Sequence, residues 1–377
     1  MKTDELKQYL DNLVHKDNIP SVDCIVYKNH EEIFRYMTGT VNEEKTQPVS
    51  PNQLYLMFSM TKVQTMTALM QLVEQGKISL EDEVAKYLPA YEKLTVKTDN
   101  GDAVPAKNRL LVKHLVSMQS GLDYDLERAG IVEVLKEKRE LATTQEIVNA
   151  FPKTPLLFEP GTHFEYSLSH DVVAAIIEVV SGMKFSEYLK KNIWEPLNMK
   201  DTRFAKPLNE DERIAEQYIC DEMTGMVIMM DKSCMYQISE AYESGGAGLI
   251  SSTADYAKLA DALATGGIGM NGIRILEEET VRLFQNNLLG TVSNKELVEK
   301  MGRIGYGYGI GMQIFLHPEH TKSNAPAGIF GWDGAAGSCI QMDISQRMSF
   351  VFTMHVRNYG PAYSDIHPAL RDMIFGK

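Results

Sequence analysis

The chain has 377 residues, of which 44% are hydrophobic and 24% are charged, and its formal net charge is -13. This length can fill one large domain or two packed ones, with a core that needs no disulfide. The negative charge argues against nucleic acid or an anionic membrane surface as the main partner. No cysteines form a C-x-x-C pair, which predicts free buried thiols rather than disulfides or a metal site at Cys24, Cys220, Cys234 and Cys339.

The N-terminal segment, residues 1–15, mixes charged residues with leucines at helical spacing and predicts an amphipathic helix. A signal peptide would need an unbroken apolar stretch, which this segment lacks. No apolar run elsewhere approaches the length that spans a membrane. We therefore expect a cytoplasmic protein without a membrane partner.

Two strands are predicted at residues 22–27 and 32–37, and the sequence after Gly76 is mainly helical. Ser79-Leu80-Glu81-Asp82 resembles a capping box that opens a helix, which Pro89 ends. Further helices are predicted at residues 110–118, 144–151, 171–180, 185–194, 255–263 and 277–285. From residue 305 the pattern predicts strands at 305–315, 338–343 and 348–355, and then a last helix at 363–374.

Strands at both ends of the chain with helices between them predict an α/β (α+β) fold. We expect one antiparallel sheet built from both termini and flanked by the first and last helices, with an inserted all-helical domain. The sheet domain would comprise residues 1–75 and 305–377, and the mainly helical domain residues 76–304. A cleft between these two regions is the expected place for an active site.

The stretch Phe58-Ser59-Met60-Thr61-Lys62 lies where an irregular, proline-containing segment gives way to an apolar-periodic run. Ser59 is therefore expected near the first turn of a buried helix, with Lys62 one turn further along the same face. A serine hydroxyl becomes nucleophilic when a base takes its proton, and a lysine can be that base when desolvation lowers its pKa. S-x-x-K is the nucleophile motif of penicillin-recognising enzymes.

Taken alone, S-x-x-K is a weak signal, because two fixed positions in four match by chance about once in a chain of this length. A second copy occurs at Ser181-Gly182-Met183-Lys184. That copy follows a predicted helix and contains the glycine that would end it, so its context does not suit a nucleophile. On the motif alone, Ser59 is equally well explained as an ordinary serine at a helix start.

A second candidate group is the hydroxyl of Tyr166. Pro160 and Gly161 force a turn, after which Tyr166 follows in a loop just ahead of a helix. A tyrosine there could share a proton with Ser59 and Lys62 and later donate it to a leaving group. A core tyrosine with a satisfied hydroxyl is the commoner case.

The third candidate is the glycine-rich stretch Gly331-Trp332-Asp333-Gly334-Ala335-Ala336-Gly337, which runs into the strand predicted at residue 338. Small residues before an edge strand let a substrate approach closely and free a backbone N–H to stabilise an oxyanion. A plain glycine turn in a hairpin is the alternative.

Several short segments follow one another in a characteristic order: Phe58-Ser59-Met60-Thr61-Lys62, Ser120-Gly121-Leu122-Asp123-Tyr124, Pro160-Gly161-Thr162, Tyr166-Ser167-Leu168, Ser181-Gly182, Glu195-Pro196-Leu197 with Met199, Gly245-Gly246-Ala247-Gly248-Leu249 and Trp332-Asp333-Gly334. In this order the chain resembles the serine β-lactamase-related hydrolases, on the side of class C β-lactamases and family VIII carboxylesterases. The match spans nearly the whole chain, so its combined specificity far exceeds that of S-x-x-K.

The resemblance implies a role for each matching residue. Ser59 would be acylated, Lys62 would be the base or its partner, and Tyr166 would complete the proton relay. The N–H groups of Ser59 and Ala335 would form the oxyanion hole, and water would then release the acyl group. No cofactor and no metal are implied.

The resemblance also places Leu168, Trp332, Asp333 and Gly334 at the substrate, where the chain departs from the β-lactamase pattern. Those enzymes carry an asparagine in place of Leu168 and Lys-Thr-Gly in place of Trp332-Asp333-Gly334. An Asp333 anion in the cleft would repel the carboxylate of a β-lactam or D-alanyl peptide by about a few kcal/mol, whereas an uncharged ester avoids this penalty. Tyr-Ser-Leu and Trp-x-Gly are similar to the esterase branch, although glycine is the more usual middle residue there.

We therefore expect a carboxylesterase that acts on small or medium acyl esters. A β-lactamase or D-alanyl-D-alanine peptidase with a lactam or amide substrate, an acyltransferase and a non-catalytic relative are the alternatives. No G-x-S-x-G elbow occurs in the sequence, which disfavours an α/β-hydrolase.

Two other groups of residues have open interpretations. His317 and His320 flank a proline in a polar loop, which favours a solvated surface over a metal-ligand pair. A methionine-rich stretch could line an adaptable acyl pocket or simply fill gaps in the core; its members are Met223, Met226, Met229, Met230 and Met235.

Overall fold

A computed structural model of the protein describes residues 2–204, 208 and 211–376. The outer limits of the predicted domains, residues 1 and 377, lie outside the described residues, as do residues 205–207 and 209–210 of the predicted helical range. The largest element is a seven-stranded antiparallel sheet. Its strands, in spatial order, are β10 (Tyr306–Tyr308), β11 (Gln313–Phe315), β12 (Phe330–Asp333), β13 (Cys339–Asp343), β14 (Met348–Thr353), β1 (Ser21–Lys28) and β2 (Glu31–Gly39).

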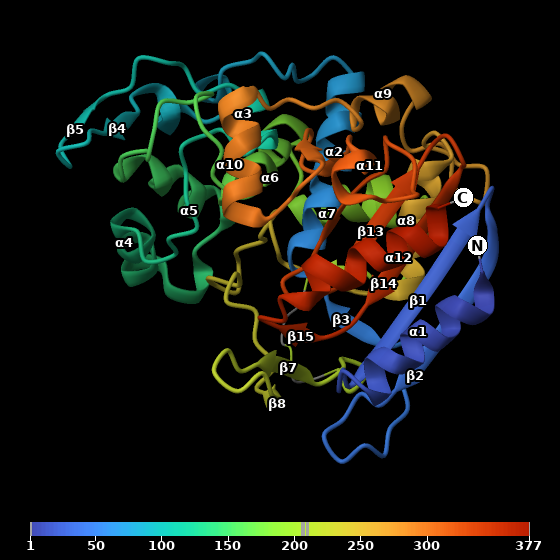
Figure 1. Ribbon diagram of the computed structural model, residues 1–377. Helices are drawn as coiled ribbons and strands as arrows, with labels where there is room; N and C mark the ends of the chain where they lie inside the picture. The colour runs from blue at the N-terminus through green and yellow to red at the C-terminus, as the bar shows by residue number, and fades with distance from the viewer. Residues whose placement is uncertain (1, 205–207, 209–210, 377) are drawn as a thin grey trace.

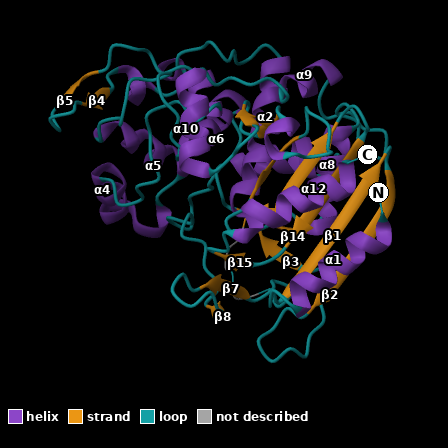
Figure 2. Ribbon diagram, viewed as in Figure 1, coloured by secondary structure: helices purple, strands orange, loops and turns teal. Residues whose placement is uncertain are grey.

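The prediction of one sheet built from both termini is confirmed, because β1 from the N-terminal part of the chain pairs directly with β14 from the C-terminal part. Figure 2 shows these strands gathered at one side of the molecule, with most of the helices beside them. Helices α1 (Thr3–His15) and α12 (His367–Phe375) cover one face of the sheet (Figure 1). Helix α8 (Thr253–Ala264) packs against β1, β13 and β14.

Both faces of the sheet are buried, and alternate residues of each central strand enter different hydrophobic clusters. On β1, Val22, Cys24 and Val26 pack with α1 and α12, whereas Ile25 joins the large core on the other side. Strands covered on both faces read as nearly continuous apolar runs, which is why β1 and β14 could be recognised from the sequence.

The remaining helices surround the large core and include most of those predicted. They are α2 (Thr61–Glu74), α3 (Val112–Val116), α4 (Ala129–Lys138), α5 (Thr144–Ala150), α6 (Ser169–Ser181), α7 (Phe185–Leu189), α9 (Glu278–Leu283), α10 (Thr291–Met301) and α11 (Pro318–Thr321). Gly182 ends α6 with a left-handed φ of 68°, so the second S-x-x-K copy lies at a helix C-terminus, as expected. None of the helices that the structure describes combines the length and the apolar character needed to cross a bilayer.

Three small sheets were not predicted. Their strands are β3 (Leu54–Leu56), β9 (Leu249–Ser252) and β6 (Arg203–Phe204); β15 (Val356–Arg357), β7 (Gln217–Cys220) and β8 (Val227–Met230); and β4 (Thr95–Lys97) with β5 (Ala103–Pro105). Strands of two to four residues carry too little alternation to stand out in a sequence. The pairing of β3 with β9 matters most for function, because β3 leads directly to Ser59.

The prediction of a helix after the capping-box sequence Ser79-Leu80-Glu81-Asp82 is wrong. Asp82 Oδ2 accepts a hydrogen bond from the Ser79 N–H at 2.7 Å and another from the Tyr87 hydroxyl at 2.5 Å, so the polar residues close a turn instead. Only the short 3₁₀ turn Val84–Lys86 follows before Pro89.

Two predictions about the C-terminal strands also need correction. The single strand expected at residues 305–315 is divided into β10 and β11, because Gly311 adopts a φ of 68° in the turn between them. The strand β13 is not an edge strand, since it pairs with β12 on one side and β14 on the other. The stretch containing Trp332 and Asp333 therefore belongs to a strand itself, β12.

The division into two domains stays a prediction. Helix α8 lies within the range assigned to the helical domain, yet its apolar side chains pack on the seven-stranded sheet. A boundary drawn from sequence alone could not detect this contact, because α8 has the same helical pattern as its neighbours.

The packing of α1 predicts a clear effect of truncating one leucine. Leu10 is fully buried between α1 and the sheet, so Leu10→Ala should lower the free energy of unfolding by about 2–5 kcal/mol. Leu141 is 75% exposed, and the control Leu141→Ala should change it by less than about 0.5 kcal/mol. Equal effects in urea denaturation would contradict this account of the core.

Candidate functional site

Ser59 lies in a sharp turn between a strand and a buried helix. Strand β3 pairs with β9, and the 3₁₀ turn Phe58–Met60 then leads into α2. Phe58 adopts a φ of 44°, which is uncommon for a residue with a side chain, and its ring is fully packed in a hydrophobic cluster. The turn leaves Ser59 partly exposed while both of its neighbours are buried.

Lys62 follows in the first turn of α2 and is completely buried. Its Nζ atom lies 3.1 Å from Ser59 Oγ, 2.8 Å from the Tyr124 hydroxyl and 2.7 Å from the carbonyl oxygen of Gly246. A carbonyl oxygen only accepts hydrogen bonds, so the amine must donate one hydrogen to Gly246. The structure thus brings Ser59 and Lys62 together as the motif spacing predicts.

Burial lowers the pKa of Lys62 to about 7, because the ammonium ion loses its hydration. The negative charges of Asp171 and Asp333 oppose this shift but do not cancel it. The neutral amine is therefore well populated near neutral pH. Only in that form can the lysine accept a proton from Ser59.

Tyr166 completes this group. The Trp332 Nε1–H donates a hydrogen bond to the Tyr166 hydroxyl at 2.9 Å. Ser59 is near enough to the Tyr166 side chain to lower its pKa. The Lys62 Nζ atom lies 4.7 Å from the centre of the Tyr166 ring. Burial raises the pKa of Tyr166 above its usual range, and the polar groups of Ser59 and Trp332 only partly oppose this effect. Tyr166 therefore keeps its proton at neutral pH.

Tyr124 is a site residue that the sequence reasoning missed. Besides its bond to Lys62, its ring packs against Tyr166 and Tyr236, with ring centres 5.4 Å and 5.5 Å apart. Burial raises the pKa of Tyr124 well above its ordinary value. The only signal in the sequence was its place in the segment Ser120-Gly121-Leu122-Asp123-Tyr124, which assigned it no role.

Asp171 was also missed, and it lies behind Lys62. This fully buried carboxylate accepts hydrogen bonds from Tyr242 at 2.6 Å and Ser244 at 2.7 Å. A Cβ atom on Gly246 would lie 2.8 Å from Asp171 Oδ2 and 3.4 Å from Lys62 Nζ. Glycine at position 246 therefore allows the carboxylate and the amine to approach the same peptide. Burial raises the pKa of Asp171 despite these hydrogen bonds.

The turn between β12 and β13 reaches the segment just before Ser59. A Cβ atom on Gly334 would lie 2.5 Å from the carbonyl oxygen of Met57, so the two backbones are in close contact. Ala335 packs against the same hydrophobic cluster as Phe58. Within the described part of the chain, the Ala335 N–H has no hydrogen-bond acceptor. It is therefore free to bind a ligand oxygen.

Trp332 and Asp333 point to opposite faces of β12, as successive residues of a strand must. Trp332 is buried in the large core, where its ring packs against Tyr308 with centres 5.0 Å apart. Asp333 pairs with Cys339, which belongs to the cluster beneath α1 and α12. The carboxylate thus lies on the face away from the Trp332–Tyr166 contact.

The charge of Asp333 is paired with a cation, which the expectation of an anion in the cleft that repels a substrate carboxylate did not include. Asp333 Oδ2 lies 2.5 Å from Arg303 Nη2, and both side chains are buried. The His367 Nδ1 atom lies 3.9 Å from the same oxygen. No sequence pattern indicates this pair, because Arg303 and Asp333 are distant in the chain and follow no motif. The ion pair with Arg303 therefore removes most of the repulsion expected between Asp333 and a substrate carboxylate.

Leu168 lies just before α6 and is only 1% exposed. Its side chain belongs to the large core, and its N–H donates a hydrogen bond to the carbonyl oxygen of Asp123 at 3.1 Å. The structure does not bring the Leu168 side chain to the surface with Ser59. What the chain lacks at this position is the polar amide of an asparagine.

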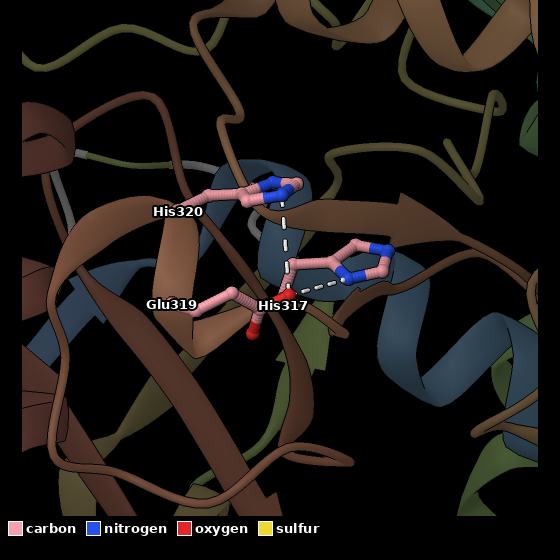
Figure 3. Close-up of side chains that lie close together, drawn as sticks. All are labelled: His317, Glu319 and His320. Carbon is pink, nitrogen blue, oxygen red and sulfur yellow. Dashed lines mark hydrogen bonds and ion pairs between the residues drawn. The ribbon is translucent and has the colours of Figure 1, made fainter.

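A group of side chains that could hold a metal ion lies elsewhere, at α11. His317 Nδ1 and His320 Nε2 approach Glu319 Oε1 at 3.1 Å and 3.9 Å (Figure 3). The three residues are exposed, and their candidate ligand atoms lie within 4.8 Å of one another. Exposure of both histidines agrees with the predicted solvated loop. None of these residues contacts Ser59, Lys62 or Tyr166.

Four of the five methionines lie in the hairpin of β7 and β8, and Met235 follows it; most of them face solvent. Met226 and Met229 line a groove of about 760 Å³ beside the end of α1. None of the three candidate catalytic residues lines that groove, so the acyl-pocket interpretation stays a prediction. Met235 alone is linked to the site, through Arg357, which contacts both its sulfur and the Phe58 ring.

Comparison with known proteins agrees with the fold. Residues 6–372 match the Beta-lactamase family, and the chain belongs to that family of serine hydrolases. Esterase EstB of Burkholderia gladioli is 23% identical over 395 residues, which cover 99% of this chain and 95% of that protein. A putative D-alanyl-D-alanine carboxypeptidase of Escherichia coli K12 is 25% identical over 357 residues, which cover 88% of this chain and 77% of that protein.

The fold is also that of a solved relative. The structure of EstCE1, a hydrolase with promiscuous acyltransferase activity, matches this chain with a TM-score of 0.79 at 22% sequence identity. The match covers 99% of this chain and 98% of the EstCE1 chain. The predicted fold, similar to that of β-lactamases and penicillin-binding proteins, is thereby confirmed.

The charge of Asp171 should control the titration of Lys62. Asp171→Asn removes a negative charge that raises the Lys62 pKa, so the amine should lose its proton below the wild-type midpoint of about 7. The midpoint can be measured by NMR of protein labelled with ¹³C-lysine, with the Lys62 signal assigned by its loss in Lys62→Met. The control Asp261→Asn removes a buried carboxylate that contacts His30 instead and should leave the midpoint unchanged. An unchanged or higher midpoint in Asp171→Asn would contradict the proposed coupling.

Proposed function

We propose that the protein is a carboxylesterase that hydrolyses small or medium acyl esters through an acyl-enzyme on Ser59. The observation that carries this proposal is the 3.1 Å contact between Ser59 Oγ and a fully buried lysine amine whose pKa is about 7. A serine beside such a base is an activated nucleophile.

In the proposed first step, the neutral Lys62 amine takes the proton of Ser59 Oγ as that oxygen attacks the ester carbonyl carbon. The N–H groups of Ser59 and Ala335 would stabilise the oxyanion. The bond to the leaving oxygen then breaks, and that oxygen receives the proton through Tyr166, which is re-protonated by Lys62. The products of this step are an alcohol and the acylated serine.

In the second step, water attacks the acyl carbon and gives its proton to the Lys62–Tyr166 pair. The ester bond to Ser59 Oγ breaks, the serine recovers a proton and the carboxylic acid leaves. Each group returns to its starting protonation state. The reaction therefore needs no further reactant.

The preference for an uncharged ester rests on two features of the site. Trp332 stands where penicillin-recognising relatives carry a lysine, and the guanidinium of Arg303 is already paired with Asp333. Neither the Trp332 indole nor the paired Arg303 guanidinium therefore offers a free cation to a substrate carboxylate. The similarity to EstB, which is named as an esterase, supports the same choice.

The catalytic assignment predicts large losses of activity. Ser59→Ala and Lys62→Ala should each lower kcat/KM for a p-nitrophenyl short-chain ester by several orders of magnitude. Tyr166→Phe should lose less or comparable activity, about 10²- to 10⁴-fold, since it removes one proton-transfer group. Initial rates from released chromophore give these values. Tyr87→Phe, which alters a tyrosine bonded to Asp82, is a matched control that should leave kcat/KM unchanged.

The same experiment separates the alternatives if the intact mass of the protein is followed. Ester turnover with an acyl adduct that is absent in Ser59→Ala supports the proposal. Adduct or turnover with a cephalosporin alone would assign the protein to the penicillin-recognising branch. Acyl transfer to an added alcohol in preference to water would favour an acyltransferase. Near-normal turnover by Ser59→Ala would overturn the proposed nucleophile.

The pKa of Lys62 predicts the pH dependence of this reaction. Below about pH 7 the lysine is an ammonium ion and cannot accept a proton, so kcat/KM should rise as the pH increases through about 7 and then level off. The raised pKa values of Tyr166 and Tyr124 predict no loss of activity through deprotonation up to pH 9. Rates with a neutral ester from pH 5.5 to 9 test this profile. Activity that falls across that midpoint would contradict it.

A further inference from the structure

The backbone of residues 334–337, which joins β12 to β13 and carries Ala335, is held by the C-terminal part of the chain. We call these residues the oxyanion turn. Tyr363, in the helical turn Ala362–Ile366 before α12, donates its hydroxyl hydrogen to the carbonyl oxygen of Gly334 at 2.9 Å. This carbonyl immediately precedes the Ala335 N–H and belongs to the same peptide group. Its orientation therefore fixes the orientation of that N–H.

The other end of the oxyanion turn has a similar contact. His367, the first residue of α12, lies with its Nε2 atom 2.8 Å from the carbonyl oxygen of Gly337. Since a carbonyl oxygen only accepts, Nε2 carries the hydrogen. Burial lowers the pKa of His367, although the charge of Asp333 opposes this shift, and the ring therefore remains a neutral donor near neutral pH.

A third bond holds the middle of the turn, where the Val356 N–H donates to the carbonyl oxygen of Ala336 at 3.1 Å. Three carbonyl groups of the turn are thus bonded to groups outside it. The Ala335 N–H, in contrast, has no acceptor among the residues described. Hydrogen bonds therefore hold three carbonyl groups of the turn, whereas the Ala335 N–H stays available to a ligand.

We propose that Tyr363 and His367 are positioning residues, which hold the oxyanion turn so that the Ala335 N–H points at the reacting carbonyl oxygen. This inference rests on the proposed function, since it assigns a role to the oxyanion hole of that reaction. An oxyanion donor acts only when it lies about 2.7–3.1 Å from the developing charge. A misplacement of about 1 Å can reduce the rate by about 10²-fold.

The oxyanion turn needs support because its own sequence is permissive. Gly334 and Gly337 lie at its two ends, and Gly337 adopts a φ of 86°. Glycines populate many backbone conformations. The hydrogen bond from the Gly337 N–H to the Gly334 carbonyl oxygen therefore does not by itself restrict the turn to one conformation. The hydroxyl of Tyr363 and the imidazole of His367 select one of them from outside.

Tyr363→Phe tests the proposal with the smallest change, because it removes the hydroxyl and keeps the ring. We expect kcat for a p-nitrophenyl ester to fall about tenfold while KM changes by less than about twofold, since the donor acts mainly in the transition state. The rate of labelling by a fluorophosphonate probe, whose phosphoryl oxygen enters the same oxyanion hole, should fall by a similar factor. Thermal unfolding then reports whether the folded fraction is unchanged.

Matched variants separate positioning from packing. Tyr359→Phe alters a tyrosine on the same C-terminal segment that packs in the outer cluster, and it should leave kcat and labelling unchanged. His367→Leu should lower kcat, and His367→Gln, whose side-chain amide can donate to Gly337, should restore part of the loss. Rescue by the glutamine variant would not be expected if the histidine only filled space.

The outcomes also distinguish this proposal from the proposed function. Wild-type kcat and labelling rates in both Tyr363→Phe and His367→Leu, with Ser59→Ala inactive, would overturn only the positioning role. Losses that merely match a smaller folded fraction would overturn it as well. If the wild-type protein neither hydrolyses the ester nor is labelled at Ser59, the proposed function fails, and the positioning role fails with it.

Discussion

The site depends on one unfavourable event, the transfer of a lysine amine from water into the protein core. Helix α2 is buried on every side from Thr61 to Leu72, so Lys62 cannot extend to solvent. Burying an ammonium ion costs several kcal/mol, whereas the neutral amine avoids that cost. The same packing that stabilises α2 therefore supplies a base near neutral pH. Gly246, Tyr124 and Ser59 then satisfy the few hydrogen bonds that the amine can make.

The seven-stranded sheet contributes to the site through one strand with two different faces. On one face of β12, Trp332 supports Tyr166; on the other, Asp333 is bound by Arg303 beneath the C-terminal helix. Adjacent residues of a strand point in opposite directions, and Arg303 joins the two contacts because its guanidinium also lies 5.4 Å from the centre of the Trp332 ring. The pairing of β1 with β14 joins the two ends of the chain in this sheet, and β11 and β13 hold β12 between them.

The sequence was sufficient for the parts of the molecule that have a local pattern. Amphipathic spacing predicted α1 and α6, apolar runs predicted β1 and β14, and S-x-x-K with its context predicted the contact of Ser59 with Lys62. Residues that act through tertiary contacts could not be predicted in this way. Tyr124, Asp171 and Arg303 reach the site from distant segments, and no spacing connects them to their partners. The failed capping box at Ser79 shows the converse, since its polar residues are equally suited to closing a turn.

In the proposed function, Trp332, which stands where penicillin-recognising relatives carry a lysine, bears on both substrate choice and catalysis. A cation at this position would bind a substrate carboxylate, whereas the indole offers no charge and donates its only N–H to the Tyr166 hydroxyl. In the proposed mechanism, that bond orients the group that passes the proton to the leaving oxygen. In the proposed function, the indole that leaves a substrate carboxylate without a cation thus also supports the proton relay. Restoring a lysine at position 332 would introduce a cation beside Lys62 and disfavour its protonated form, so both properties would change together.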